Sequence, residues 1–166
     1  MPDIAWLDER EERAWRALQF MQMRLNAELA HQLALESGLS YQDYLVLVVL
    51  TDRPEGRARL FELARYLGWE KSRLSHHIAR MSERGLVSKE KCDSDRRGSF
   101  VVVTERGRQE IEAAAPGHVA AVRRLFIGPL SGGQLDALGA ACETVLAALD
   151  RHQRSQDEAG TPTRPE

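Results

Sequence analysis

The sequence lacks the features that direct a chain into or across a membrane. It has no run of the roughly 18 apolar residues that a transmembrane helix requires. Its first residues, MPDIAWLDEREERAW, are acidic and lack the apolar core of a signal peptide. We therefore expect a cytoplasmic protein with no membrane partner.

Cysteine is scarce, and its positions argue against a metal or disulfide framework. Cys92 and Cys142 are far apart in the chain and lack the spacing of metal ligands. We expect both to be free thiols in a reducing compartment. Cys142 falls on an apolar stripe and is predicted to be core. Cys92 falls in a predicted hairpin, where packing or simple exposure is favoured over redox sensing.

Catalytic motifs are also missing. GxSxG, HExxH and the phosphate-cradling glycine loop are all absent. His76 and His77 are adjacent, but neighbouring side chains on a helix point about 100° apart, so this pair is poorly placed to chelate one ion. The sequence therefore predicts neither an enzyme nor a metal or cofactor site.

A net positive charge is lacking, since the formal charge is −2. The distribution of charge reverses this first impression. Residues 53–108 carry 14 Lys and Arg against 8 Asp and Glu, a net charge of +6, and the remainder carries 9 against 17, a net charge of −8. A basic middle flanked by acidic ends is typical of a DNA-binding module on an acidic scaffold.

The basic middle contains the pattern of a recognition helix. Residues 72–84 repeat Leu74, Ile78 and Met81 with helical spacing, which makes one apolar stripe. The opposite face is predicted to carry side chains able to contact an anion or a base. These are Arg73, Ser75, His76, His77 and Arg80.

A hairpin pattern follows the helix. Gly85 stands where helices commonly end, and residues 86–87 begin an extended segment. Residues 93–98 predict a turn, and residues 100–103 predict the returning strand. Helix, strand, basic turn and strand together form a winged helix. The helix fits the major groove of DNA and the hairpin reaches a neighbouring minor groove.

Two short helices are predicted before the recognition helix. Ser40 is a suitable N-cap for a helix over residues 41–50, and Asp43 lies near the positive end of that helix dipole. Residues 61–67 predict the second helix, and residues 59–60 predict a short strand that pairs with the wing. This order is that of a winged helix-turn-helix.

Longer amphipathic helices are predicted at both ends of the chain. Residues 6–35 repeat apolar residues at threes and fours. Trp15 and Phe20 lie off this stripe, which favours contact with a partner chain over the alternative of a fully buried core helix. A helix kinked at Pro116 and a last helix over residues 134–152 follow the wing.

These elements predict a mainly α fold with a small antiparallel β wing. Residues 1–38 and 108–154 would form a helical dimerisation domain, residues 39–107 the winged helix-turn-helix, and residues 155–166 a disordered tail. The terminal helices have more apolar surface than a small winged helix can cover, so we expect a symmetric homodimer. Such a dimer presents two recognition helices to one face of double-stranded DNA and predicts a roughly palindromic operator.

The central stretch resembles the multiple-antibiotic-resistance regulator (MarR) family. The resemblance covers about residues 6–152, and it rests on an ordered set of short motifs with the correct spacing. The matching residues are Glu62, Leu63, Ala64, Leu67, Gly68, Ser72, Ser75, Arg84, Gly85, Leu86, Val87, Asp95, Arg96, Arg97, Thr104 and Gly107.

The resemblance implies a homodimeric, sequence-specific transcriptional regulator, usually a repressor, often released from DNA by a small aromatic ligand. It implies that Asp95 pairs with Arg97, and that Arg96 or Arg97 at the wing tip enters the minor groove, where an arginine sheds its water readily. The helix residues expected to face DNA are Ser72, Arg73, Ser75, His76 and Arg80. His77 is also included among the expected DNA-binding residues.

Three positions depart from the family pattern. Glu70 precedes the recognition helix where Ser or Asp is usual, and it is a poorer cap. His76 and His77 stand near the start of this helix, where arginine is common. Asp93 replaces a proline often found early in the wing. We expect sequence preference, pH dependence and wing stiffness to differ accordingly.

An effector pocket, if present, should lie where the dimerisation helices meet the winged helix. The candidates are Trp15, Tyr41, Tyr44 and His118, since aromatic walls with a few polar groups suit a small aromatic acid. These aromatics are at least as readily explained as ordinary core. Two alternative functions remain, a DNA-binding protein without a ligand response and a winged-helix adaptor between proteins.

Overall fold

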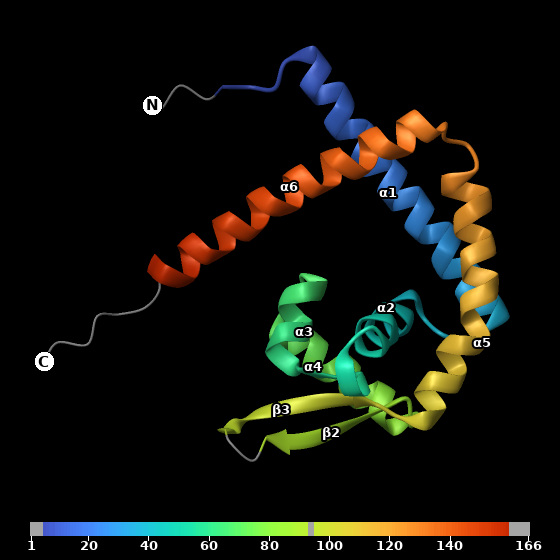
Figure 1. Cartoon of the computed structure of the whole chain (residues 1–166), viewed down its shortest axis with the longest axis vertical. Coiled ribbons are helices and arrows are strands. Elements are labelled where there is room, and N and C mark those ends of the chain that lie inside the picture. The colour runs from blue at the N-terminus through green and yellow to red at the C-terminus, as the bar shows by residue number, and fades with distance from the viewer. Residues whose placement is uncertain (1–4, 93–94, 160–166) are drawn as a thin grey trace, which may run out of the picture. The chain divides into compact units, whose positions relative to one another are not determined.

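A computed structural model describes residues 5–92 and 95–159 of the chain, with side chains described for 5–90 and 99–155. The chain divides into two compact units, Met1–Val122 and Arg123–Glu166 (Figure 1). The elements of the first unit are α1 (Glu9–Glu36), α2 (Tyr41–Thr51), a short 3-10 helix (Pro54–Gly56), β1 (Arg57–Arg59), α3 (Leu60–Leu67), α4 (Lys71–Glu83), β2 (Val87–Cys92), β3 (Asp95–Val103) and α5 (Glu105–Val122).

The start of α1 is determined by its cap. The side chain of Asp8 accepts hydrogen bonds from the backbone N–H groups of Arg10 and Glu11, and Glu11 returns the contact to the Asp8 N–H in a capping box. The helix therefore begins at Glu9, three residues later than the predicted start. Among its residues only Leu29 and Leu33 are buried in the chain.

The nearly continuous apolar run after Gly38 is a helix, as its cap predicts. Ser40 and Asp43 form a capping box, with both side chain to backbone distances at 3.0 Å. Gly38 itself has a φ of +68°, the left-handed conformation that turns the chain between α1 and α2. Most of α2 is buried, and Leu47 and Leu50 have no exposed surface.

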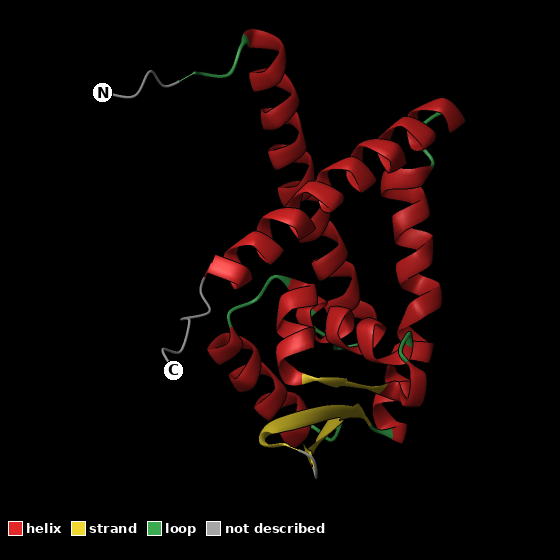
Figure 2. Ribbon diagram, turned by 60° about the vertical axis from the view of Figure 1, so that its left-hand side comes forward, coloured by secondary structure: helices red, strands yellow, loops and turns green. Residues whose placement is uncertain are grey.

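The three strands form one antiparallel sheet in the order β1-β3-β2. Arg57 pairs with Val102 on one side of β3, and Val87 pairs with Val103 on the other. The first strand lies two residues earlier than predicted, over Arg57–Arg59. Figures 1 and 2 show α2, α3 and α4 on one side of the wing strands. The core lies between these helices and the sheet, and Leu63, Leu74, Ile78, Met81 and Val101 are completely buried in it.

The junction between the wing and α5 joins backbone groups from both ends of the winged helix. The Thr104 side chain oxygen accepts a hydrogen bond from the Gly107 N–H at 3.0 Å, and its hydroxyl lies 2.6 Å from the carbonyl oxygen of Gly85. A side chain at Gly107 would overlap the carbonyl oxygen of Leu86, so only glycine fits there. Helix α5 continues through Pro116 to Val122.

The second unit contains a π-helical segment, Arg123–Ile127, and α6 (Gly132–Ala159). Ser131 and Gln134 exchange backbone to side chain hydrogen bonds, so α6 begins at Gly132, two residues before the predicted start. The helix also extends past residue 152, and residues 155–159 are helical where a disordered tail was predicted; residues 160–166 lie outside the described chain.

The apolar side chains of α6 are exposed in the chain. Val145, Leu146 and Leu149 each keep more than half of their surface. Cys142 is an exposed free thiol, so the prediction that it is core was wrong for the single chain. The apolar stripe along α6 was correctly recognised, but its side chains are not buried in the single chain.

Within the described residues, no single helix is long and apolar enough to span a bilayer, and the only combination that meets the length and composition requirement is α1 with α2, which are bent by 86°.

Candidate nucleic-acid interface

Helix α4 has one buried and one exposed face. Leu74, Ile78 and Met81 have no exposed surface, so the helix is held against the core by its apolar stripe. Ser75 is half-buried. The predicted contact residues that are exposed are Ser72, Arg73, His76 and Arg80.

His77 does not share the exposed face, and its grouping with the exposed residues was wrong. Its side chain is only 8% exposed. It lies three residues after Leu74 and four before Met81, which is the spacing of the buried stripe, so helical geometry already indicated its inward position. Its ring packs edge-on against Trp69, with the centroids 5.4 Å apart.

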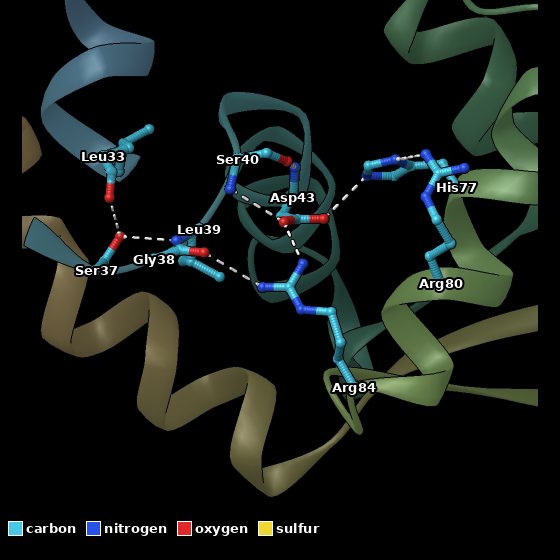
Figure 3. Close-up of polar contacts among 9 residues, drawn as sticks. All are labelled: Leu33, Ser37, Gly38, Leu39, Ser40, Asp43, His77, Arg80 and Arg84. Atoms are coloured by element: carbon cyan, nitrogen blue, oxygen red, sulfur yellow. Dashed lines mark hydrogen bonds and ion pairs between the residues drawn. The ribbon is translucent and has the colours of Figure 1, made fainter. Parts of the chain in front are cut away.

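A buried carboxylate holds His77 and the end of α4 (Figure 3). Asp43 is 2% exposed. Its Oδ2 accepts a hydrogen bond from Nη1 of Arg84 at 2.6 Å, and its Oδ1 lies 3.1 Å from Nε2 of His77. That nitrogen is buried and forms no hydrogen bond of regular geometry. Its contact with Asp43 is therefore close but poorly aligned.

The hydrogen bonds around His77 indicate its tautomer. Nη2 of Arg80 lies 3.1 Å from Nδ1 of His77. Because a guanidinium has only donors, Nδ1 must be the acceptor, and the ring proton then resides on Nε2, which faces Asp43. Arg80, His77, Asp43 and Arg84 thus form a continuous polar chain, which we call the Asp43 network.

The charge of Asp43 is stabilised by this network. Burial alone would raise the pKa of its carboxyl, but the contacts with His77, Arg84 and Ser40 outweigh burial and hold the pKa far below its usual value. Asp43 is therefore ionised at neutral pH. Arg84 also reaches the carbonyl oxygen of Gly38 at 3.5 Å, so the network connects α4 with the α1–α2 turn.

From the sequence, Arg84 was expected only as a position of the family pattern, and Asp43 only as a residue near the start of a helix. One signal was available: His77 and Arg84 are seven residues apart, which puts both on one side of α4. Nothing local indicated that the carboxylate facing them would come from position 43.

The wing is described at the level of its strands. Lys89 pairs with Val101 and Lys91 with Ser99, and the register becomes irregular between Lys91 and Cys92. The side chains predicted to contact DNA here, Asp95, Arg96 and Arg97, lie outside the described side chains, as do those of Cys92 and Asp93. The roles assigned to them remain predictions.

Three of the four candidate effector residues lie together. The rings of Tyr44 and His118 are 4.3 Å apart, and those of Tyr41 and His118 are 6.5 Å apart. We call these three residues the aromatic cluster. Trp15 does not join it: the indole is 54% exposed, and no ring contact to it is found among the described residues.

Burial affects two of the three polar groups of the aromatic cluster. It lowers the pKa of His118, so the imidazole is neutral at pH 7, and its Nδ1 is buried without a hydrogen-bond partner. Burial, with Asp52 and Tyr41 nearby, raises the pKa of the Tyr44 hydroxyl. His118 and Tyr44 therefore present uncharged hydrogen-bonding groups on aromatic walls.

Arginine and aromatic side chains also meet at the edge of the sheet, an arrangement that was not predicted from the sequence. The guanidinium carbons of Arg57 and Arg59 lie 5.0 and 5.3 Å from the centroid of Phe100. Such contacts hold long cations in extended positions. Among the residues that the structure describes, no group of three or more His, Cys, Asp or Glu side chains is arranged to hold a metal ion.

Comparison with known families matches residues 37–98 to the MarR family. None of the curated proteins compared matches the chain. Among solved structures, AbsC, a MarR family transcriptional regulator from Streptomyces coelicolor, is 39% identical, with a TM-score of 0.82 over 89% of this chain and 99% of that one. Sco3205, a MarR family regulator from the same organism solved in complex with DNA, is 37% identical, with a TM-score of 0.81 over 87% and 94%.

A more distant likeness supports the fold alone. BpsR of Bordetella bronchiseptica, whose DNA binding is regulated by 6-hydroxynicotinic acid, is 21% identical, with a TM-score of 0.71 over 80% of this chain and 98% of that one. The identity to AbsC extends along nearly the whole of that protein, and the family match covers the winged helix as far as residue 98. The chain belongs to the MarR family and is a DNA-binding transcriptional regulator, not an enzyme.

Proposed function

We propose that the chain is a homodimeric repressor that reads a roughly palindromic operator with α4 and the wing, and that a small aromatic ligand releases it from DNA. The observation that carries this proposal is the two-sided character of α4. Three apolar side chains anchor one face completely, and the other face exposes Ser72, Arg73, His76 and Arg80.

In this proposal α4 enters the major groove. Arg73 and Arg80 are long donors suited to phosphate or base edges, and Ser72, Ser75 and His76 add shorter hydrogen-bonding groups. The guanidinium carbon of Arg73 lies 5.1 Å from the centroid of Trp69, which limits its freedom before DNA arrives. Arg96 and Arg97 enter the adjacent minor groove, with Asp95 holding Arg97 extended.

Dimerisation is supported by the apolar surface that each chain leaves exposed. In α1, Trp15 and Phe20 are more than half exposed, and α6 exposes Leu146 and Leu149 to a similar extent. Side chains of this kind in two long helices favour a symmetric interface with a second copy. Such a dimer presents α4 twice to one face of the duplex.

Release by a ligand is supported by the aromatic cluster. Tyr41, Tyr44 and His118 offer rings for stacking, and the unpartnered Nδ1 of His118 offers a hydrogen-bond acceptor or donor. BpsR, which has a similar fold, responds to a small aromatic acid. A regulator of this kind acts in the cytoplasm, where the DNA is.

The test is fluorescence anisotropy with DNA from upstream of the chain's own gene, a scrambled duplex and a salt series. We expect the upstream DNA to bind more tightly and its affinity to fall steeply with salt. Arg97→Ala should weaken specific binding by about 1–3 kcal/mol, the usual contribution of a groove contact. Arg151→Ala, an exposed arginine on α6, is the matched control and should change nothing.

Equal affinity for both duplexes would first lead to a selection from random sequences. If the selection also recovers no preferred site and Arg97→Ala has no effect, the operator-binding proposal is wrong. A winged-helix adaptor would then become the better explanation, because an adaptor does not need a basic wing tip.

A further inference from the structure

A pocket lies between the first turn of α2 and the exposed side of α4, away from the aromatic cluster. Its volume is about 420 Å³. Tyr41, Tyr44 and His118 do not line it. The lining residues that matter chemically are Asp43, Trp69, Arg73, His77, Arg80 and Arg84.

The charges of this α2–α4 pocket do not cancel. Three guanidinium groups face a single carboxylate, so among these four groups the positive charges outnumber the negative ones by two. Asp43 is already engaged by Arg84. Among the described residues, no carboxylate forms an ion pair with Arg73 or Arg80.

The two arginines without a carboxylate partner are held in place. Arg73 lies over the ring of Trp69, and Arg80 donates to Nδ1 of His77. His77 is itself fixed, since it is more than nine-tenths buried, contacts Asp43 and packs against Trp69. Fixed guanidinium groups with spare N–H donors bind oxyanions well, because little side chain entropy is lost on binding.

We propose that the α2–α4 pocket binds a phosphoryl group through Arg73 and Arg80. The inference rests on the proposed function in one respect, since operator DNA lying along α4 brings its backbone phosphates to this position. A free phosphate-bearing molecule has the same chemistry and would compete with DNA there. In either case the phosphate binds the two arginines of α4, while Asp43 keeps Arg84 in its ion pair.

The first arm of the test measures free phosphate without DNA. Trp69 lines the pocket, and the chain has only two other tryptophans, so the variant Trp6→Phe/Trp15→Phe makes Trp69 the sole reporter. Inorganic phosphate is titrated against this variant at constant ionic strength, with chloride as the reference. The same titration is made after adding Arg73→Gln/Arg80→Gln, and after adding Arg65→Gln/Arg124→Gln as a matched pair of exposed arginines outside the pocket.

The second arm measures phosphate supplied by DNA. A duplex obtained by selection from random sequences is prepared with uncharged methylphosphonate at one backbone position at a time. We expect one position in each half-site to weaken binding about tenfold in the wild type, the effect of losing one charged hydrogen-bonded contact. In Arg73→Gln/Arg80→Gln this position should no longer matter, whereas Arg65→Gln/Arg124→Gln should behave as the wild type. Circular dichroism checks that all variants are folded.

The outcomes separate the source of the phosphate. A position-specific methylphosphonate effect that the pocket variant removes identifies the DNA backbone. A saturable Trp69 response to free phosphate that only the pocket variant removes identifies a free ligand. This result does not require DNA binding, so it would support the phosphate site even if the operator-binding proposal were wrong. If neither response depends on Arg73 and Arg80, the pocket is not a phosphate site.

Discussion

The winged-helix core and α6 are both rich in apolar residues, but they use them differently. Leu47, Leu74 and Ile78 in the core have no exposed surface, whereas Leu146 and Leu149 in α6 are 59% and 52% exposed. Both α4 and α6 have an amphipathic pattern. The core therefore buries its apolar surface within the chain, and we infer that α6 buries its own against a second copy. The same type of residue stabilises folding in one region and, in the proposed dimer, association in the other.

The largest expected effect comes from breaking the core. Leu74→Ala should lower the free energy of unfolding by about 2–5 kcal/mol, because it removes a fully buried side chain and leaves a cavity. Urea unfolding followed by circular dichroism at fixed protein concentration measures the change. Phe61→Ala on α3, where the ring is 53% exposed, is the control and should cost much less. Similar losses for both variants would contradict the assigned core.

A smaller effect is expected in α6, and on a different quantity. Burying a leucine contributes about 1.5–3 kcal/mol, so Leu149→Ala should weaken the dimer roughly 10- to 100-fold and leave the winged helix folded. Sedimentation over a range of concentrations measures this, with Glu143→Ala on the same helix as the control. An unchanged association constant, or a chain that is monomeric from the outset, would remove the proposed explanation for the exposed stripe.

The Asp43 network tests whether a polar contact supports the core. Asp43→Asn keeps the shape of the side chain but removes its charge, which leaves Arg84 without its ion pair and weakens the contact with His77. We expect a loss of about 1–3 kcal/mol in the free energy of unfolding, the range for a compromised buried polar group. DNA affinity should fall as well, since α4 loses its anchor to α2. Asp136→Asn, on the exposed side of α6, is the matched control.

Acid should have the same effect on the wild type as Asp43→Asn has at neutral pH. The pKa of Asp43 is lowered in the folded chain, so its contribution is fully present above the unfolded-state pKa of about 3.9 and is lost as the pH falls further. The difference in stability between wild type and Asp43→Asn should therefore narrow below about pH 4. A constant difference across that range would mean that the network does not depend on the ionised carboxylate.

The smallest effect is expected from the aromatic cluster. Burial lowers the pKa of His118. Below about pH 6.5 this imidazole therefore binds a proton in the unfolded chain but stays neutral in the folded chain. Stability should fall modestly as the pH decreases through this window, and His118→Gln should remove that part of the slope. The control is His31→Gln, an exposed histidine on α1. Equal slopes in wild type and His118→Gln would contradict a neutral, buried imidazole.

The errors of the sequence interpretation share a physical origin. His77 was grouped with exposed residues although its spacing from Leu74 and Met81 indicated burial, so the information was local and was misread. Trp15 was joined to Tyr41, Tyr44 and His118 because it is aromatic, but no local pattern specifies which helices meet. Cys142 was taken as core since an apolar stripe does not reveal whether its partner belongs to the same chain.

Local chemistry alone determined most of the elements. Periodicity identified α4 and α6, and side chain caps at Ser40 and Thr104 marked where α2 and α5 begin, because capping and amphipathicity involve residues only a few positions apart. The ordered motifs of the winged helix also sufficed to indicate the family.

Only the tertiary structure decided which distant groups meet. The bond between Asp43 and Arg84 joins residues 41 positions apart, and the ring contact of Tyr44 with His118 joins different helices. Such pairs depend on how α2 packs against α4 and α5. That packing is a property of the whole core, whereas hydrophobic spacing within a helix specifies only which face turns inward and not what it will touch.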